Sequence, residues 1–100
     1  MTGLLKVSGE QELLIDEIEQ LRLQIGHGEA RRSRALPADR IDDAEFRVFS
    51  QFGEDGIIQF LLGHVPIEDD TFVEFGVQSY AESNTRFLLC NDNWRGLIID

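Results

Sequence analysis

The sequence predicts an α/β fold, in which an amphipathic N-terminal helix precedes the first strands of a parallel sheet. Three observations support this: a β-rich segment at 71–75 closed by Gly76, an apolar helix at 86–90, and a second apolar strand at 97–100. A strand, a helix and a strand within about 30 residues form a β-α-β unit, whose strands lie parallel. We therefore expect a truncated Rossmann-like sheet, whose other strands would follow Asp100.

The N-terminal helix is predicted from its cap and its apolar spacing. Ser8 and Gln11 have the spacing of a capping box, so the helix is expected to begin there. Gly26 is expected to end it. Apolar residues recur between these limits at steps of four, three and four, which places them on one stripe: Leu14, Ile18, Leu21 and Ile25. The stripe would pack either on the rest of the chain or on a second copy, so a homodimer through this helix is one alternative.

A linker is predicted between this helix and the sheet domain. Residues 26–43 are rich in Gly, Arg, Ala and Asp and include Pro37, which breaks regular structure. Three arginines in this stretch are expected to lie on a solvated, mobile segment: Arg31, Arg32 and Arg34. The chain is accordingly divided into 1–44, a helix and linker, and 45–100, the first part of the sheet domain.

A second helix is predicted over 54–62. Acidic residues in its first turn are favoured by the helix dipole, and Gly63 is expected to end it. His64 follows, and a capping or exposed histidine is favoured over a metal ligand because no second ligand stands at helical spacing. No metal site is therefore predicted within the sequence.

The composition argues against several classes of function. The formal net charge of −10, from 19 acidic and 9 basic residues, argues against nucleic-acid binding, which needs a local excess of Lys and Arg. No long apolar run is present, so a cytoplasmic protein without membrane contact is expected. The single cysteine, Cys90, lies in an apolar run and is expected to be buried and inert.

The candidate site lies where the two predicted strands end. Glu74 and Asp100 stand at the carboxyl ends of these strands, where a parallel sheet binds a nucleoside. A carboxylate at Asp100 would accept hydrogen bonds from the paired hydroxyls of a ribose. Gly76 would let the backbone turn sharply beside the ligand. The alternatives are a carboxylate at 74 that only orients the loop and a plain turn acid at 100.

The loop after the first strand indicates which ligand it fits. A dinucleotide site needs glycines where the pyrophosphate approaches the backbone, but Gln78 stands two residues after Gly76. S-adenosylmethionine has no phosphate, and its ammonium group suits a carboxylate such as Glu74. The loop therefore favours S-adenosylmethionine over NAD or FAD.

Four ordered motifs resemble those of the FkbM-like S-adenosylmethionine-dependent methyltransferases. They are 50–55 (SQFGED), 72–76 (FVEFG), 82–85 (ESNT) and 93–100 (NWRGLIID). The resemblance spans 46–100 and implies a class I methyltransferase fold. It also implies methyl transfer to a hydroxyl of a sugar, polysaccharide or related natural product. Within the family, the chain is similar to polysaccharide O-methyltransferases, those that modify methylmannose polysaccharide among them.

The resemblance also implies a set of cofactor contacts. By position they are Gln51, Glu74, Gly76, Ser79, Asn84, Thr85 and Asp100. Gln78 and Tyr80 depart from the family pattern, in which many relatives have a small residue. The catalytic base, and any divalent metal such as Mg²⁺, would lie after Asp100. Two other functions stay open: a nucleotide-dependent oxidoreductase, and a non-enzymatic interaction module that works through the N-terminal helix.

Overall fold

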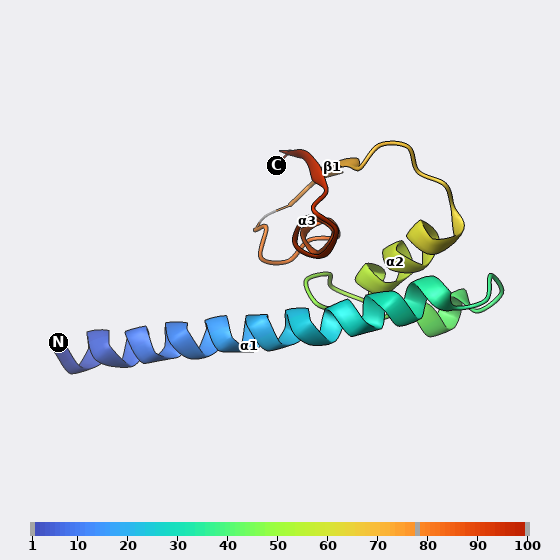
Figure 1. The fold of residues 1–100 in the computed structure, drawn as a ribbon. Helices are drawn as coiled ribbons and strands as arrows, with labels where there is room; N and C mark the ends of the chain where they lie inside the picture. Colours follow the sequence, from blue (N-terminus) through green and yellow to red (C-terminus); the bar gives the residue numbers. More distant parts are fainter. Residues whose placement is uncertain (1, 78, 100) are drawn as a thin grey trace.

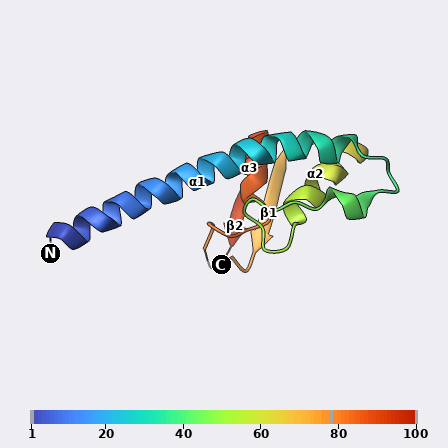
Figure 2. The same cartoon turned by 90° about the horizontal axis from the view of Figure 1, so that it is seen from below.

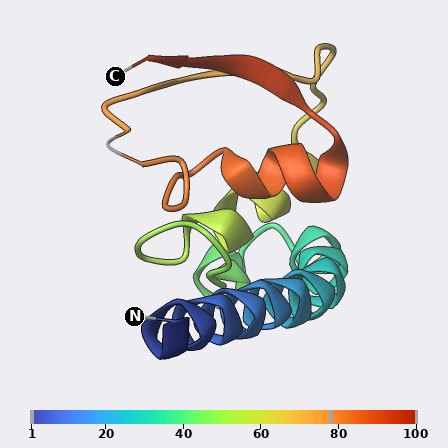
Figure 3. The same ribbon diagram turned by 90° about the vertical axis from the view of Figure 1, so that its left-hand side faces the viewer.

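The computed structural model describes residues 2–77 and 79–99, and the side chains of 9–77 and 79–99. Its elements, in chain order, are α1 (Thr2–Ala35), the 3-10 helix η1 (Ile41–Ala44), α2 (Glu54–His64), β1 (Thr71–Phe75), α3 (Arg86–Asp92) and β2 (Arg95–Ile99). The α1 helix forms one layer, α2 and α3 lie next to it, and the two strands lie on the far side (Figures 1 and 3). The predicted mixed α/β architecture, with a long N-terminal helix and a parallel pair of strands, is confirmed.

The two strands pair in parallel, with α3 as their connection (Figure 2). Val73 pairs with Leu97 at the centre of the register. β2 begins at Arg95, two residues earlier than predicted, because the Arg95 amide donates to the Asp70 carbonyl at 3.0 Å. The chain reverses before it through Asn93, whose left-handed φ of 58° ends α3. Both strands therefore end at the same edge.

The α1 helix is longer than predicted at both ends. It begins at Thr2 and does not stop at Gly26 but continues to Ala35. The reason is packing: a Cβ at Gly26 would lie 2.8 Å from ring atom Cε1 of Phe87 and 2.8 Å from Cγ2 of Val48. Gly26 is thus a point of close approach between α1 and the rest of the chain, and it does not terminate the helix.

The predicted linker over 26–43 is wrong as far as Ala35, because α1 continues to that residue. Arg31, Arg32 and Arg34 are exposed as predicted, but they lie on this helix and not on a mobile segment. The Arg34 guanidinium donates from Nε to Gln59 Oε1 at 2.8 Å and pairs with Asp92 Oδ1 at 2.5 Å. Gln59 is fully buried and donates to the other Asp92 oxygen at 2.6 Å. These three side chains join α1, α2 and α3, so Arg34 belongs to the packing of the fold.

The apolar core lies where α1 crosses the segment before α2 and the start of α3. Its buried members are Ala30, Val48, Phe49 and Phe87, with Leu23 and Phe46 packed against them. The rings of Phe46 and Phe87 meet edge to face at a centroid distance of 5.4 Å. Cys90 is exposed, contrary to its predicted burial. α3 buries Phe87 and Leu88, and two residues further along a helix the side chain lies on the opposite side.

Candidate functional site

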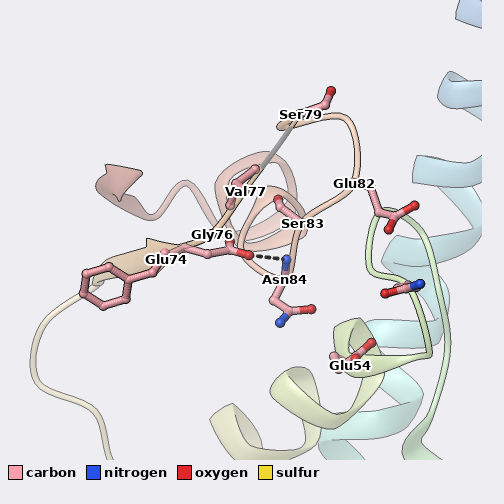
Figure 4. Close-up of a pocket in the computed structure, with 10 residues that line it drawn as sticks. Glu54, Glu74, Gly76, Val77, Ser79, Glu82, Ser83 and Asn84 are labelled. Atoms are coloured by element: carbon pink, nitrogen blue, oxygen red, sulfur yellow. Dashed lines mark hydrogen bonds between the residues drawn. The ribbon is translucent and has the colours of Figure 1, made fainter. Parts of the chain in front are cut away.

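A hollow of about 590 Å³ opens at the carboxyl end of β1 (Figure 4). Three segments form its walls: the start of α2, the end of β1 with the residues after it, and the loop before α3. The lining residues are Gln51, Glu54, Glu74, Phe75, Gly76, Val77, Ser79, Glu82, Ser83 and Asn84. A carboxyl edge of parallel strands is where open α/β sheets bind ligands.

Asp55 holds the first wall in place. Its side chain is 1% exposed, and Oδ2 accepts hydrogen bonds from the backbone amides of Val48, Phe49 and Ser50 at 2.7, 2.8 and 3.0 Å. The Asp55 amide in turn donates to Ser50 Oγ at 3.1 Å. A buried carboxylate is costly unless it is hydrogen-bonded, and here it folds the preceding backbone around itself. Gln51, which follows this turn, is thereby set at the hollow.

Glu74 holds the second and third walls together. Oε2 accepts from the Asn84 amide at 3.0 Å, and Oε1 accepts from the Thr85 amide at 3.0 Å and from the Thr85 hydroxyl. Figure 4 shows the bond to Asn84. Both oxygens therefore order the loop before α3, and the same carboxylate also lines the hollow. Gly76, with a φ of +72°, turns the chain beside this carboxylate, and among the described residues other than its chain neighbours no atom lies within 4 Å of where its Cβ would be.

The loop before α3 is fastened to the first wall at Phe49. The Ser83 amide donates to the Phe49 carbonyl at 3.0 Å. The Arg86 guanidinium lies 4.0 Å from the centroid of the Phe49 ring, and it donates to the Ala81 carbonyl at 3.1 Å. The Ser83 hydroxyl accepts from the Arg86 amide at 3.2 Å. The hollow thus has walls that are connected to one another.

The hollow is acidic. Three carboxylates line it, from Glu54, Glu74 and Glu82, and among the described residues no Lys, Arg or His lines it. Glu54 accepts from the Phe52 amide at 2.9 Å, and Glu82 is exposed. Figure 4 shows Glu54 across the hollow from Asn84. Such a site attracts cationic groups and repels phosphates.

The structure brings together most of the residues singled out from the sequence. Gln51, Glu74, Gly76, Ser79 and Asn84 all line the hollow. The side chain of Thr85 does not; it is buried behind the wall, where its hydroxyl meets Glu74 and lies 3.2 Å from that of Tyr80. Asp100, the predicted ribose contact, and Gln78 lie outside the described residues.

Sequence reasoning missed two of the three acids, Glu54 and Glu82. Both belong to the motifs at 50–55 and 82–85, so the signal was present. In the sequence, the position of Glu54 in the first turn of a helix is already explained by the helix dipole. An acid in the first turn also faces the space in front of the helix, where the hollow lies. Both acids reach the hollow because the segments around Asp55 and Ser83 are folded back onto β1 and onto each other.

Neither metal binding nor membrane spanning adds to the functional argument. Among the described residues, no three His, Cys, Asp or Glu side chains stand close enough to hold a metal ion. No helix in that part of the chain has the length and apolar character needed to cross a bilayer.

Comparisons of this chain with protein-family models, curated proteins and solved structures found no match. Function must therefore be inferred from the hollow and its acids.

Proposed function

We propose that this chain is the cofactor-binding part of an S-adenosylmethionine-dependent O-methyltransferase with a Rossmann-like class I fold. The observation that carries the proposal is the position of three carboxylates, Glu54, Glu74 and Glu82, around a hollow at the carboxyl end of the first strand of a β-α-β unit. The acceptor is a hydroxyl of a sugar, polysaccharide or related natural product, as the motif resemblance implies.

The charge of the hollow fits this cofactor better than a dinucleotide. S-adenosylmethionine carries a sulfonium and an ammonium group, which oppose a single carboxylate, so it is cationic. NAD carries two phosphates, which the three acids would repel. The sulfonium is also the group from which the methyl is transferred, since bound S-adenosylmethionine supplies a methyl group activated by the positive sulfur. An acidic wall therefore favours the charged cofactor over its neutral thioether product.

The residues of this chain have separate tasks in the proposed site. Glu82 and Glu54 supply negative charge, and the Asn84 and Ser79 side chains supply hydrogen-bonding groups at the rim. Glu74 orders the loop that carries Asn84, so it is a positioning residue. These tasks are binding and orientation, which contribute to catalysis by fixing the reactants in place.

Calorimetry on the whole chain tests the proposal. We expect S-adenosylmethionine to bind more tightly than S-adenosylhomocysteine, and NAD to bind more weakly than both. Binding of NAD alone would instead favour the oxidoreductase. Absence of binding by all three would refute the cofactor site and leave the interaction module.

A matched pair of variants then locates the site. Glu82→Gln removes one charge from the hollow and should weaken binding of S-adenosylmethionine about two- to fivefold, as for other exposed charge contacts. Binding of the neutral thioether should change less. Asp69→Asn removes an exposed charge that does not line the hollow, and should leave both affinities unchanged. Equal losses in the two variants would mean that net charge, and not the site, governs binding.

A further inference from the structure

The N-terminal part of α1 extends away from the rest of the chain (Figures 1 and 2). An exposed apolar stripe runs along α1 before Gly26. The stripe is formed by Leu14, Ile18, Leu21 and Ile25, whose exposed fractions are 63, 49, 56 and 67%. The opposite side of the same helix is the one that packs, through the buried residues Gly26, Ala30 and Ser33. Packing of the fold therefore does not account for the stripe.

The stripe follows a heptad register. The register assigns Gln11, Ile18 and Ile25 to position a and Leu14 and Leu21 to position d, and in the sequence it continues back through Val7 and Leu4. Ile at a with Leu at d favours two parallel strands over higher oligomers. A polar residue at one a position, here Gln11, fixes the register of the two helices at some cost in stability.

The charges beside the stripe select a parallel partner of the same sequence. Glu17 stands at position g and Arg22 at the following e position. In a parallel pair, a g residue faces the e residue five positions later on the other helix, so Glu17 of each copy meets Arg22 of the other. Within one helix, residues five apart do not face each other. An antiparallel pair would instead place g opposite g, where Glu10 and Glu17 would repel.

From this pattern we infer that residues 10–25 of α1 form a parallel two-stranded coiled coil with a second copy of this chain. The packed side of α1 carries positions b, c and f, so the fold described above and the coiled coil use different faces of the helix. The inference is independent of the proposed methyl transfer, since none of the described side chains of α1 lines the hollow.

Sedimentation of the whole chain at micromolar concentration tests association. We expect a dimer that the double variant Leu14→Asp/Leu21→Asp converts to monomer, with at least a tenfold weaker association. The control is Leu13→Asp, because Leu13 is 68% exposed but lies at position c, off the stripe. It should leave the dimer intact. A monomeric parent chain, or a dimer that survives the double variant, would overturn the inference.

Orientation is tested by charge exchange and by cross-linking. Arg22→Glu should weaken the dimer, and adding Glu17→Lys should restore it; failure of the restoration would refute the parallel pairing. In a Cys90→Ser background, which removes the exposed native thiol, Leu14→Cys should cross-link two copies on oxidation, because equivalent d positions meet in a parallel pair. Leu13→Cys should not cross-link. Equal yields at the two positions would overturn the arrangement.

Discussion

Removal of the Asp55 carboxylate should strongly destabilise the fold. The carboxylate is 1% exposed and is the acceptor for three buried backbone amides. In Asp55→Ala each of these donors loses its partner at a cost of about 1–3 kcal/mol. Because the three bonds share one oxygen they do not add fully, and we expect a loss of about 3–5 kcal/mol. That is a large fraction of the roughly 5–15 kcal/mol typical of a folded domain.

The measurement is the free energy of unfolding from urea titration, with the slope m compared between variants. The matching melting temperature should fall by about 12–40 °C, from about 4–8 °C per kcal/mol in a chain of this size. Asp55→Asn should be intermediate, because a neutral oxygen accepts more weakly and the added NH₂ group takes the place of Oδ1, which has no partner among the described residues. Asp69→Ala, an exposed acid, should change stability by less than about 0.5 kcal/mol. A loss below about 1 kcal/mol in Asp55→Ala would refute the reasoning.

Three further changes test packing and loop order in the same urea assay. Gly56→Ala should destabilise by about 1–3 kcal/mol, because its Cβ would lie 1.9 Å from the Ala44 carbonyl oxygen; a gain from the better helix propensity of alanine would contradict the observed contact. Phe87→Ala should lower the free energy of unfolding by about 3–5 kcal/mol, since this ring is 1% exposed at the centre of the core. A loss as small as that of an exposed substitution would mean that the core lies elsewhere. Glu74→Gln should cost about 1–3 kcal/mol, because the NH₂ group that replaces one carboxylate oxygen cannot accept a hydrogen bond from the Asn84 or the Thr85 amide. Glu82→Gln should be neutral, and equal costs would reject the separation of the two roles.

The strands and short helices could be predicted because their signals are local. The apolar segment at 71–75, Gly76 and the apolar run at 86–90 each act within a few residues, and the structure has β1, the turn and α3 there. The parallel pairing followed from the short β-α-β spacing. The start of β2 was missed because it depends on the amide of Arg95 reaching Asp70, a contact that no local pattern predicts.

Much of the candidate site could be predicted because its residues stand in short motifs, but their division of labour could not. The sequence places Glu74 toward the ligand, and only the structure shows both of its oxygens bonded to the loop at Asn84 and Thr85. Glu82 stands in the motif at 82–85 but was not singled out from the sequence, yet it lines the hollow and is exposed. Whether a carboxylate binds or supports depends on which amides point at it, and that is set by the folding of a distant segment.

The glycines show why the helix boundaries were the least predictable feature. In the sequence both Gly26 and Gly63 indicate helix ends, but helices continue through both. A Cβ at Gly63 would lie 2.5 Å from the Arg34 carbonyl oxygen, just as one at Gly26 would collide with Phe87. A glycine that permits a turn and a glycine that permits close contact are identical in a single sequence, and only the neighbour distinguishes them. Here each glycine lies where two helices pack: Gly26 lets α1 approach α3, and Gly63 lets α2 approach α1. These helix–helix contacts, which the sequence does not reveal, explain why neither glycine ends its helix. They also fix α1 in place and leave its apolar stripe directed away from the fold.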